Sequence, residues 1–192
     1  MTTEVAQKLE RYSLDASASK FTAQAFAEGL LSAFGHDPVI GINDFSGEAS
    51  FVADTFESAS VKLTIKADSL AVVENVKDKD RHDLERMMRD EVLEIGKFPE
   101  IVFESNNITL SKAGTDRYRA RVIGDLNLHG VRQSNIWISG EVVIGGEGLR
   151  AKGEFAIKQT DFKIKLVSIA GGTLKIKNEV KCKFDIVARP VQ

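Results

Sequence analysis

The strongest constraint on the fold is a run of alternating apolar and polar residues from Arg117 to Gln159. Every second residue from Tyr118 to Leu128 is apolar or glycine, whereas the residues between them are mostly charged or polar. The alternation continues after Gly130 and again after a glycine-rich segment at 145–148. A period of two gives each strand one apolar face. The segment therefore predicts three successive antiparallel strands.

Two turns fix the register of these strands. The glycines at 145–148 supply the backbone angles of a short hairpin, and pairing Ile144 with Leu149 keeps both apolar faces on one side. The same register predicts the cross-strand pairs Glu141 with Lys152 and Ile123 with Trp137. One face of these strands is expected to meet a core, and the other mostly meets water.

The rest of the chain predicts five more strands and two helices. The strands are expected within residues 12–22, 39–51, 61–67, 98–105 and 173–188. Phe26, Leu30 and Phe34 have helical spacing and predict a short helical lid. Apolar residues spaced by three and four predict an amphipathic helix over 80–95.

About eight strands in hairpin order favour an all-β fold. Strands of about a dozen residues span roughly 40 Å, which suits an extended eight-stranded antiparallel up-and-down, lipocalin-like barrel. Such a barrel either fills with side chains or holds one small ligand. Several glycines fall on the predicted inner faces, namely Gly41, Gly47, Gly124, Gly140 and Gly153. Small residues there leave room, so we expect an elongated apolar cavity.

Length and composition restrict the class of protein. A chain of 192 residues without a linker predicts a polar N-terminal extension at 1–11 and a single barrel domain at 12–192. Charged residues make up 28% and the net charge is −2, so we expect no nucleic-acid partner. The single cysteine, Cys182, excludes an internal disulfide.

The N-terminus lacks a basic start followed by an apolar stretch of signal-peptide length. The sequence therefore predicts a cytoplasmic protein, or a periplasmic one if a signal has been removed. No run approaches the roughly 20 apolar residues of a membrane-spanning helix, so no integral membrane association is expected.

No recognisable catalytic, metal or cofactor motif is present. The three histidines have no metal-ligand spacing, and nucleophile-elbow, phosphate-loop and dinucleotide patterns are missing. We therefore predict no enzyme activity, no catalytic residue, no metal and no cofactor. Rows of arginine and lysine could attract a phosphate head group or nucleic acid, but a solvated barrel exterior explains them better. Trp137 is the best candidate for a contact in a homodimer.

The chain resembles the YceI-like family of polyisoprenoid-binding, lipocalin-like barrels. The resemblance runs from Tyr12 to Ala188 and depends on the order and spacing of short segments. These are Tyr12, Leu14, Asp15, Ser19 and Phe21, then Phe34-Gly35-His36, Ser69-Leu70, the segment 98–105 and the segment 124–131. The family's Asp-Phe-Gly segment reads here Asp161-Phe162-Lys163, and residues 71–95 are longer and more charged than in the common pattern.

The resemblance implies an eight-stranded barrel, often dimeric, whose apolar pore holds a polyisoprenoid, quinone-like or other amphiphilic chain. We therefore predict non-enzymatic transport or sequestration of a long-chain amphiphile. The alternative is a structural or stress-response interaction protein whose barrel is filled by its own side chains.

The predicted binding residues form two groups. The pore wall consists of Phe45, Phe51, Leu63, Ile65, Phe103, Val122, Leu126, Ile138, Val142, Phe155, Ile157 and Phe184. A mouth or lid is formed by Phe34, Met87 and Met88, and polar contacts to a head group come from His36, Arg132 and Asp161.

Overall fold

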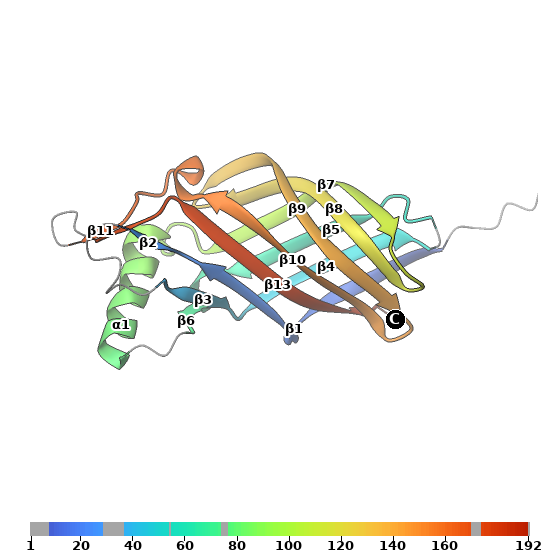
Figure 1. Cartoon of the computed structure of the whole chain (residues 1–192), viewed down its shortest axis with the longest axis horizontal. Helices are drawn as coiled ribbons and strands as arrows, with labels where there is room; N and C mark the ends of the chain where they lie inside the picture. The colour runs from blue at the N-terminus through green and yellow to red at the C-terminus, as the bar shows by residue number, and fades with distance from the viewer. Residues whose placement is uncertain (1–7, 29–36, 54, 74–76, 170–173, 192) are drawn as a thin grey trace, which may run out of the picture.

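The computed structural model describes residues 8–28, 37–53, 55–73, 77–169 and 174–191 (Figure 1). Within them, eight strands form an antiparallel barrel in which each strand pairs with its neighbours along the chain, and β13 pairs with β1 to close it. The barrel strands are β1 (Leu9–Gln24), β4 (Phe45–Val52), β5 (Ser60–Lys66), β7 (Glu100–Lys112), β8 (Arg117–Leu128), β9 (Val131–Gly145), β10 (Gly148–Lys158) and β13 (Glu179–Pro190). The predicted fold class is confirmed.

The predicted register of the central strands is confirmed as well. Ile144 pairs with Leu149 across the β9–β10 turn, as the alternation requires. The other two predicted pairs, Glu141 with Lys152 and Ile123 with Trp137, are also present.

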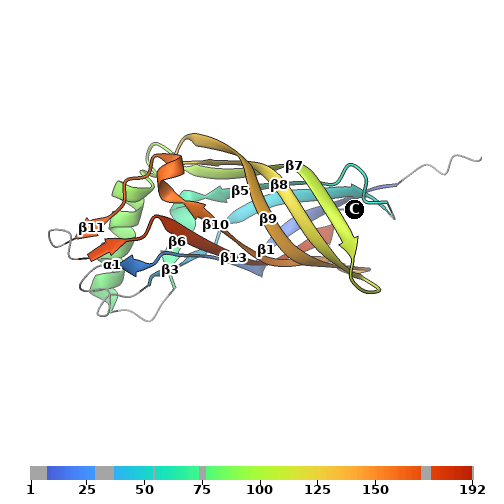
Figure 2. The same cartoon turned by 45° about the horizontal axis from the view of Figure 1, so that its top comes forward.

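The two ends of the barrel differ (Figures 1 and 2). At the hairpin end, short connections join β4 to β5, β7 to β8 and β9 to β10, and the Val191 amide donates to the Arg11 carbonyl. At the helix end lie α1 (Asp78–Met87), the β8–β9 turn and the 3-10 helix η4 (Gln159–Phe162).

The predicted amphipathic helix is present with shifted bounds. The α1 helix continues into one π-helical turn, η3 (Met88–Val92), and ends there instead of at residue 95. The chain turns away because Glu94 adopts a positive φ of 46°. Met88, Val92 and Ile95 pack against the core, as their spacing predicts.

Short strands surround the helix end. β3 (Val39–Ile42) and β6 (Leu70–Val72) extend the sheet beside β1, and β6 directly follows the 3-10 turn η2 (Ala67–Ser69). A second sheet consists of β11 (Ser168–Ile169), β12 (Leu174–Ile176) and β2 (Ala27–Glu28). The Glu85 carboxylate of α1 accepts the Val72 amide of β6 at 2.9 Å, so this helix side faces a strand edge and not water.

Three expectations need correction. The described part of the predicted lid is extended, because Ala27–Glu28 pairs with β12; residues 29–36, which include Leu30 and Phe34, lie outside the described residues. Residues 9–11 belong to β1 and pair with β4, so the polar extension is shorter than expected. The final segment, predicted as one strand over 173–188, forms the two strands β12 and β13. Between them, the backbone carbonyls of Lys177 and Asn178 accept hydrogen bonds from Gln159.

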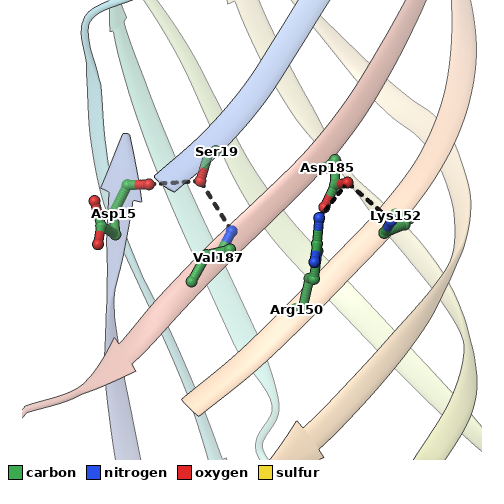
Figure 3. Close-up of polar contacts among 6 residues, drawn as sticks. All are labelled: Asp15, Ser19, Arg150, Lys152, Asp185 and Val187. Carbon is green, nitrogen blue, oxygen red and sulfur yellow. Dashed lines mark hydrogen bonds and ion pairs between the residues drawn. The ribbon is translucent and has the colours of Figure 1, made fainter. Parts of the chain in front are cut away.

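A large bulge interrupts β1 between Asp15 and Lys20, where residues 16–19 of β1 lie opposite residue 186 of β13. Ser19 holds the bulge closed: its hydroxyl donates to the Asp15 carbonyl at 2.5 Å and accepts the Val187 amide at 2.9 Å (Figure 3). The hydroxyl thus replaces the backbone ladder where the strand leaves it.

Candidate functional site

An apolar cavity of about 210 Å³ lies inside the barrel. All of its lining residues are apolar except Ser50 and Ser60, which form a pair at the hairpin end of β4 and β5. The alternation of the strands explains this lining, since every second residue points inward. The cavity therefore suits a hydrocarbon and offers no charged partner.

Most predicted wall residues line this cavity. They are Phe51, Leu63, Ile65, Phe103, Val122, Leu126, Ile138, Val142, Phe155 and Phe184. Phe45 and Ile157 belong to the packed core and do not line it. Phe45 is in edge-to-face contact with Phe21, which does line the cavity.

Some lining residues were missed by the sequence reasoning. Ile108 and Leu110 line the cavity from the second half of β7, beyond a register shift between Ser105 and Asn107. That bulge breaks the period of two, so the predicted strand stopped at residue 105. Leu14 and Phe21 line it from β1, on either side of its own bulge, and the same alternation could have identified them.

The inner-face glycines do not leave the space that was expected. A Cβ on Gly124 would lie 2.5 Å from the Phe103 ring, and a Cβ on Gly153 would lie 2.7 Å from the Phe184 ring. Both positions also face a backbone carbonyl of the adjacent strand at 2.4 Å. These glycines therefore seat aromatic rings against the wall instead of widening the pore.

The exposure of inward-facing side chains changes along the barrel. Near the helix end, Phe21, Ile65 and Phe103 are only 5–7% exposed. Towards the hairpin end, Val142 and Ile144 also point inward but are half-buried. Phe51 and Leu149 line the cavity at the same end and are only 6% and 9% exposed, so exposure there differs from strand to strand.

Aromatic rings partly cover the hairpin end. Phe56, from the β4–β5 connection, lies between Phe51 at 5.4 Å and Tyr118 at 4.8 Å between ring centroids. Tyr12 stacks on Phe51 at 5.4 Å and donates its hydroxyl to the Glu10 carboxylate at 2.7 Å. Burial, helped by that hydrogen bond, raises the pKa of Tyr12 to about 12, so the phenol stays neutral.

A polar groove of about 630 Å³ adjoins the cavity at the hairpin end. It is lined by residues 8–12, 144–146 and 190–191, and Ile144 also lines the apolar cavity. Lys8, Arg11 and Glu10 supply charged side chains to the groove. Polar and apolar spaces thus meet at one residue.

The helix end is closed by packed side chains. Phe162 of η4 is 1% exposed, and Ile164 and Leu93 are buried beside it in the same core cluster. Burial also raises the pKa of Cys182 to about 12, so this buried thiol stays protonated and is not a nucleophile.

His129 forms hydrogen bonds to two other segments at the helix end. Its Nδ1 lies 3.1 Å from the Phe162 carbonyl and its Nε2 lies 2.9 Å from a Glu94 carboxylate oxygen. Hydrogen bonds from Lys97 and His129 lower the pKa of Glu94, so both partners of the imidazole are acceptors. The His129 ring thus joins the Phe162 carbonyl of η4 to the Glu94 carboxylate that follows η3.

The predicted mouth residues are not brought together. Phe34 and His36 lie outside the described residues. Met87 is half-buried on α1, and Met88 packs against the core. Arg132 pairs with Asp125 at 2.6 Å on the barrel exterior, and neither it nor Asp161 lines the cavity.

Two further findings concern the described residues. No three of their His, Cys, Asp or Glu side chains cluster as metal ligands would. In that same part of the chain, no helix has the length and apolar character needed to cross a membrane.

Comparison with solved structures gives barrels of the same fold. Burkholderia cenocepacia BcnA is 20% identical, with a TM-score of 0.65 over 91% of this chain and 98% of that one. A polyisoprenoid binding domain from Saccharophagus degradans, implicated in plant cell wall breakdown, is 17% identical, with a TM-score of 0.68 over 94% and 98%. The Campylobacter jejuni YCEI protein is 17% identical, with a TM-score of 0.56 over 80% and 84%.

A comparison with curated proteins gives no match. The model of the YceI-like domain matches residues 12–188, which span the barrel from the first inward residue of β1 to Ala188 near the end of β13. The chain belongs to the YceI-like family.

Proposed function

We propose that this protein binds the apolar part of an amphiphile inside the barrel and carries or sequesters it without chemical change. The cavity carries the proposal, because it encloses about 210 Å³ inside the barrel and its lining is almost wholly apolar. The name of the Saccharophagus degradans neighbour, a polyisoprenoid binding domain, supports isoprenoids as the first ligands to test, beside quinone-like and fatty molecules.

The physical basis of binding is burial of hydrocarbon. Each buried methylene contributes about 0.8 kcal/mol, so a tail that fills this cavity with about eight carbons gains roughly 6 kcal/mol before the costs of association. A wall without charged groups also imposes no desolvation cost on the protein side.

The experiment is native mass spectrometry of protein purified without detergent, followed by organic extraction. We expect one apolar molecule per barrel, and added ligand should raise the melting temperature according to RT ln(1 + [L]/Kd). An empty protein that no isoprenoid, quinone or fatty acid stabilises would contradict the proposal.

A variant that fills the apolar cavity provides the control. Ala120 lines the cavity, so Ala120→Phe should place a ring in the empty space, abolish binding and cost little stability. Ala156 is exposed on β10, and Ala156→Phe should bind like the wild type. Equal binding by both variants would place the ligand outside the barrel.

The second candidate is an interaction protein that works through its outer surface. Trp137 favours it, because this side chain is 58% exposed on β9. An interaction protein with a filled barrel should not be stabilised by amphiphiles. The melting temperatures with added isoprenoid, quinone or fatty acid therefore distinguish the two functions.

A further inference from the structure

The small sheet of β11, β12 and β2 lies at the helix end and is separate from the barrel sheet (Figure 1). Its strands are antiparallel, with Ser168 opposite Lys175 on one side and Glu28 opposite Lys175 on the other. Residues that lie opposite each other in antiparallel strands point to the same face. One face of the small sheet therefore carries Lys175, so the solvated exterior of the barrel does not account for this lysine.

The same register places two apolar side chains on this face. Two positions further along, Leu166 and Phe26 flank Lys177 from either side. The Ile176 amide donates to the Val167 carbonyl at 3.0 Å and the Lys177 amide donates to the Phe26 carbonyl at 2.8 Å, so the pairing continues to these residues. Leu166 is 42% exposed and Phe26 is half-buried. Lys177 thus lies between two accessible apolar groups.

Further lysines surround these apolar groups. The Lys181 ammonium lies 5.8 Å from the centroid of the Phe26 ring, a cation–π contact. Lys163 and Lys165 are exposed in the segment that leads to Leu166. We use the name basic face for Phe26, Leu166, Lys175, Lys177 and Lys181.

The positive charge of the basic face is not neutralised by ion pairs. Among the described residues, no carboxylate forms an ion pair with any of Lys163, Lys165, Lys175, Lys177 and Lys181. Residues 158–183 contain seven lysines and two carboxylates, although the net charge of the whole chain is −2. Positive charge is therefore concentrated in this part of an otherwise acidic chain.

Lysines around accessible apolar side chains match the chemistry of a lipid surface. The ammonium groups attract anionic head groups, while the lysine stems lie along apolar surface. Leucine and phenylalanine enter the boundary between head groups and acyl chains. A nucleic acid would match the charges alone and would gain nothing from Leu166.

We propose that the basic face docks on the surface of an anionic lipid bilayer, with its ammonium groups at the lipid phosphates and Leu166 and Phe26 among the head groups. The inference goes beyond the proposed function and does not depend on the cavity. For a carrier of amphiphiles, such docking brings the protein to the phase in which amphiphiles dissolve.

The test is co-sedimentation with vesicles of phosphatidylcholine alone and of phosphatidylcholine mixed with phosphatidylglycerol. We expect binding to the mixed vesicles to be at least tenfold tighter and to lose this advantage at high salt, because the screening length is only about 10 Å at 0.1 M. Equal binding to both kinds of vesicle, or binding to neither, would overturn the inference. The proposed function would still stand, since ligand extraction tests it separately.

Charge reversal locates the contact. Lys175→Glu combined with Lys177→Glu should weaken binding to the mixed vesicles at least tenfold, since each lysine near an anionic surface contributes about fivefold. Lys181→Glu gives the same test on a barrel strand if that pair does not fold. The matched control is Lys112→Glu combined with Arg121→Glu, because both residues are exposed outside the basic face and the net charge changes equally. Equal losses in the two pairs would refute the role of the face.

A variant of the apolar part distinguishes a lipid from a nucleic acid. Leu166→Ser should weaken binding to the mixed vesicles severalfold, and the wild type should bind a single-stranded oligonucleotide more weakly than these vesicles. Unchanged vesicle binding by Leu166→Ser, together with tight binding of the oligonucleotide, would assign the basic face to a nucleic acid and overturn the inference.

Discussion

At the level of single residues, Lys163 departs from the Asp-Phe-Gly pattern that the family resemblance indicated. The structure gives a physical reason for glycine at this position: Lys163 has φ 57° and ψ 20°, the left-handed conformation in which only glycine avoids a steric cost. This chain therefore carries local backbone strain directly after Phe162, the buried residue at the end of η4.

We predict that Lys163→Gly stabilises the protein by about 0.5–1 kcal/mol, as measured by urea unfolding, because glycine adopts this conformation without strain. Lys165→Gly is the control, since Lys165 is exposed and is not among the described residues with a positive φ. That variant should be neutral or slightly destabilising. A destabilised Lys163→Gly would show that the lysine side chain compensates for the strain.

A second prediction concerns acid sensitivity. The hydrogen bond from Arg150 and the ammonium of Lys152 hold the pKa of Asp185 at about 2 (Figure 3). A carboxylate with a lowered folded-state pKa contributes stability above its unfolded value of about 3.9, and the contribution is lost as pH falls towards 2. Asp185→Asn should therefore lower the melting temperature at pH 6 but not at pH 2.

The matched control is Asp161→Asn, because Asp161 forms no ion pair with any described residue. Melting temperatures of both variants across this pH range test the prediction. Equal losses for Asp185→Asn at both pH values would mean that its ion pairs contribute nothing.

At the level of elements, the β1 bulge shows what the opening segment of the family resemblance does. Asp15 and Ser19 come from that segment, and both lie at the bulge, where they shape the strand that closes the barrel. Asp15 also accepts hydrogen bonds from Ser17 and Arg189, which lower its pKa to about 2. These residues are structural and lie outside the cavity.

Ser19→Ala should destabilise the barrel by about 1–3 kcal/mol, because it leaves the Val187 amide without a partner at a part-buried position. Ser17→Ala should cost less, since Ser17 is exposed and bonds only to the neighbouring Asp15 carboxylate. Guanidinium or urea unfolding measures both variants. Equal costs would contradict the closing role of Ser19.

The latch between His129, Glu94 and the Phe162 carbonyl joins three elements at the helix end. We predict that His129→Ala costs about 1–3 kcal/mol and increases hydrogen exchange in η4, because it leaves the carbonyl unpaired. His82→Ala, an exposed histidine on α1, is the control and should change neither quantity. Exchange in η4 that stays at the wild-type rate in His129→Ala would mean that the latch does not hold this end.

For the whole molecule, alternation and turn glycines sufficed to predict the barrel, the register of its central strands and ten of the 25 residues that line the cavity. They could not predict where the pore is hollow, because Phe45 and Phe51 obey the same alternation on β4, yet only Phe51 lines the cavity. That difference arises from η4 and η3, which fill the helix end through contacts distant in sequence. The bulges in β1 and β7 could not be predicted either, because a bulge interrupts the alternation that identifies a strand.

The homodimer stays a prediction, and the outer face of β9 is the place to test it. Trp137 is 58% exposed beside its pair Ile123, so we expect Trp137→Ser to raise the dimer dissociation constant at least tenfold in light scattering or analytical ultracentrifugation. Leu166→Ser removes another exposed apolar side chain, 42% exposed, and should have no effect. A wild-type protein that is monomeric at all concentrations would exclude the dimer.

The position of the first and last barrel strands has a practical consequence for handling the protein. β1 begins and β13 ends at the hairpin end, next to the polar groove, so a tag or surface linker fused near either would crowd that groove. A cysteine introduced at exposed His82 on α1 would attach a dye or a sensor surface at the opposite end. Because Cys182 is buried and protonated, maleimide chemistry would label the new site alone.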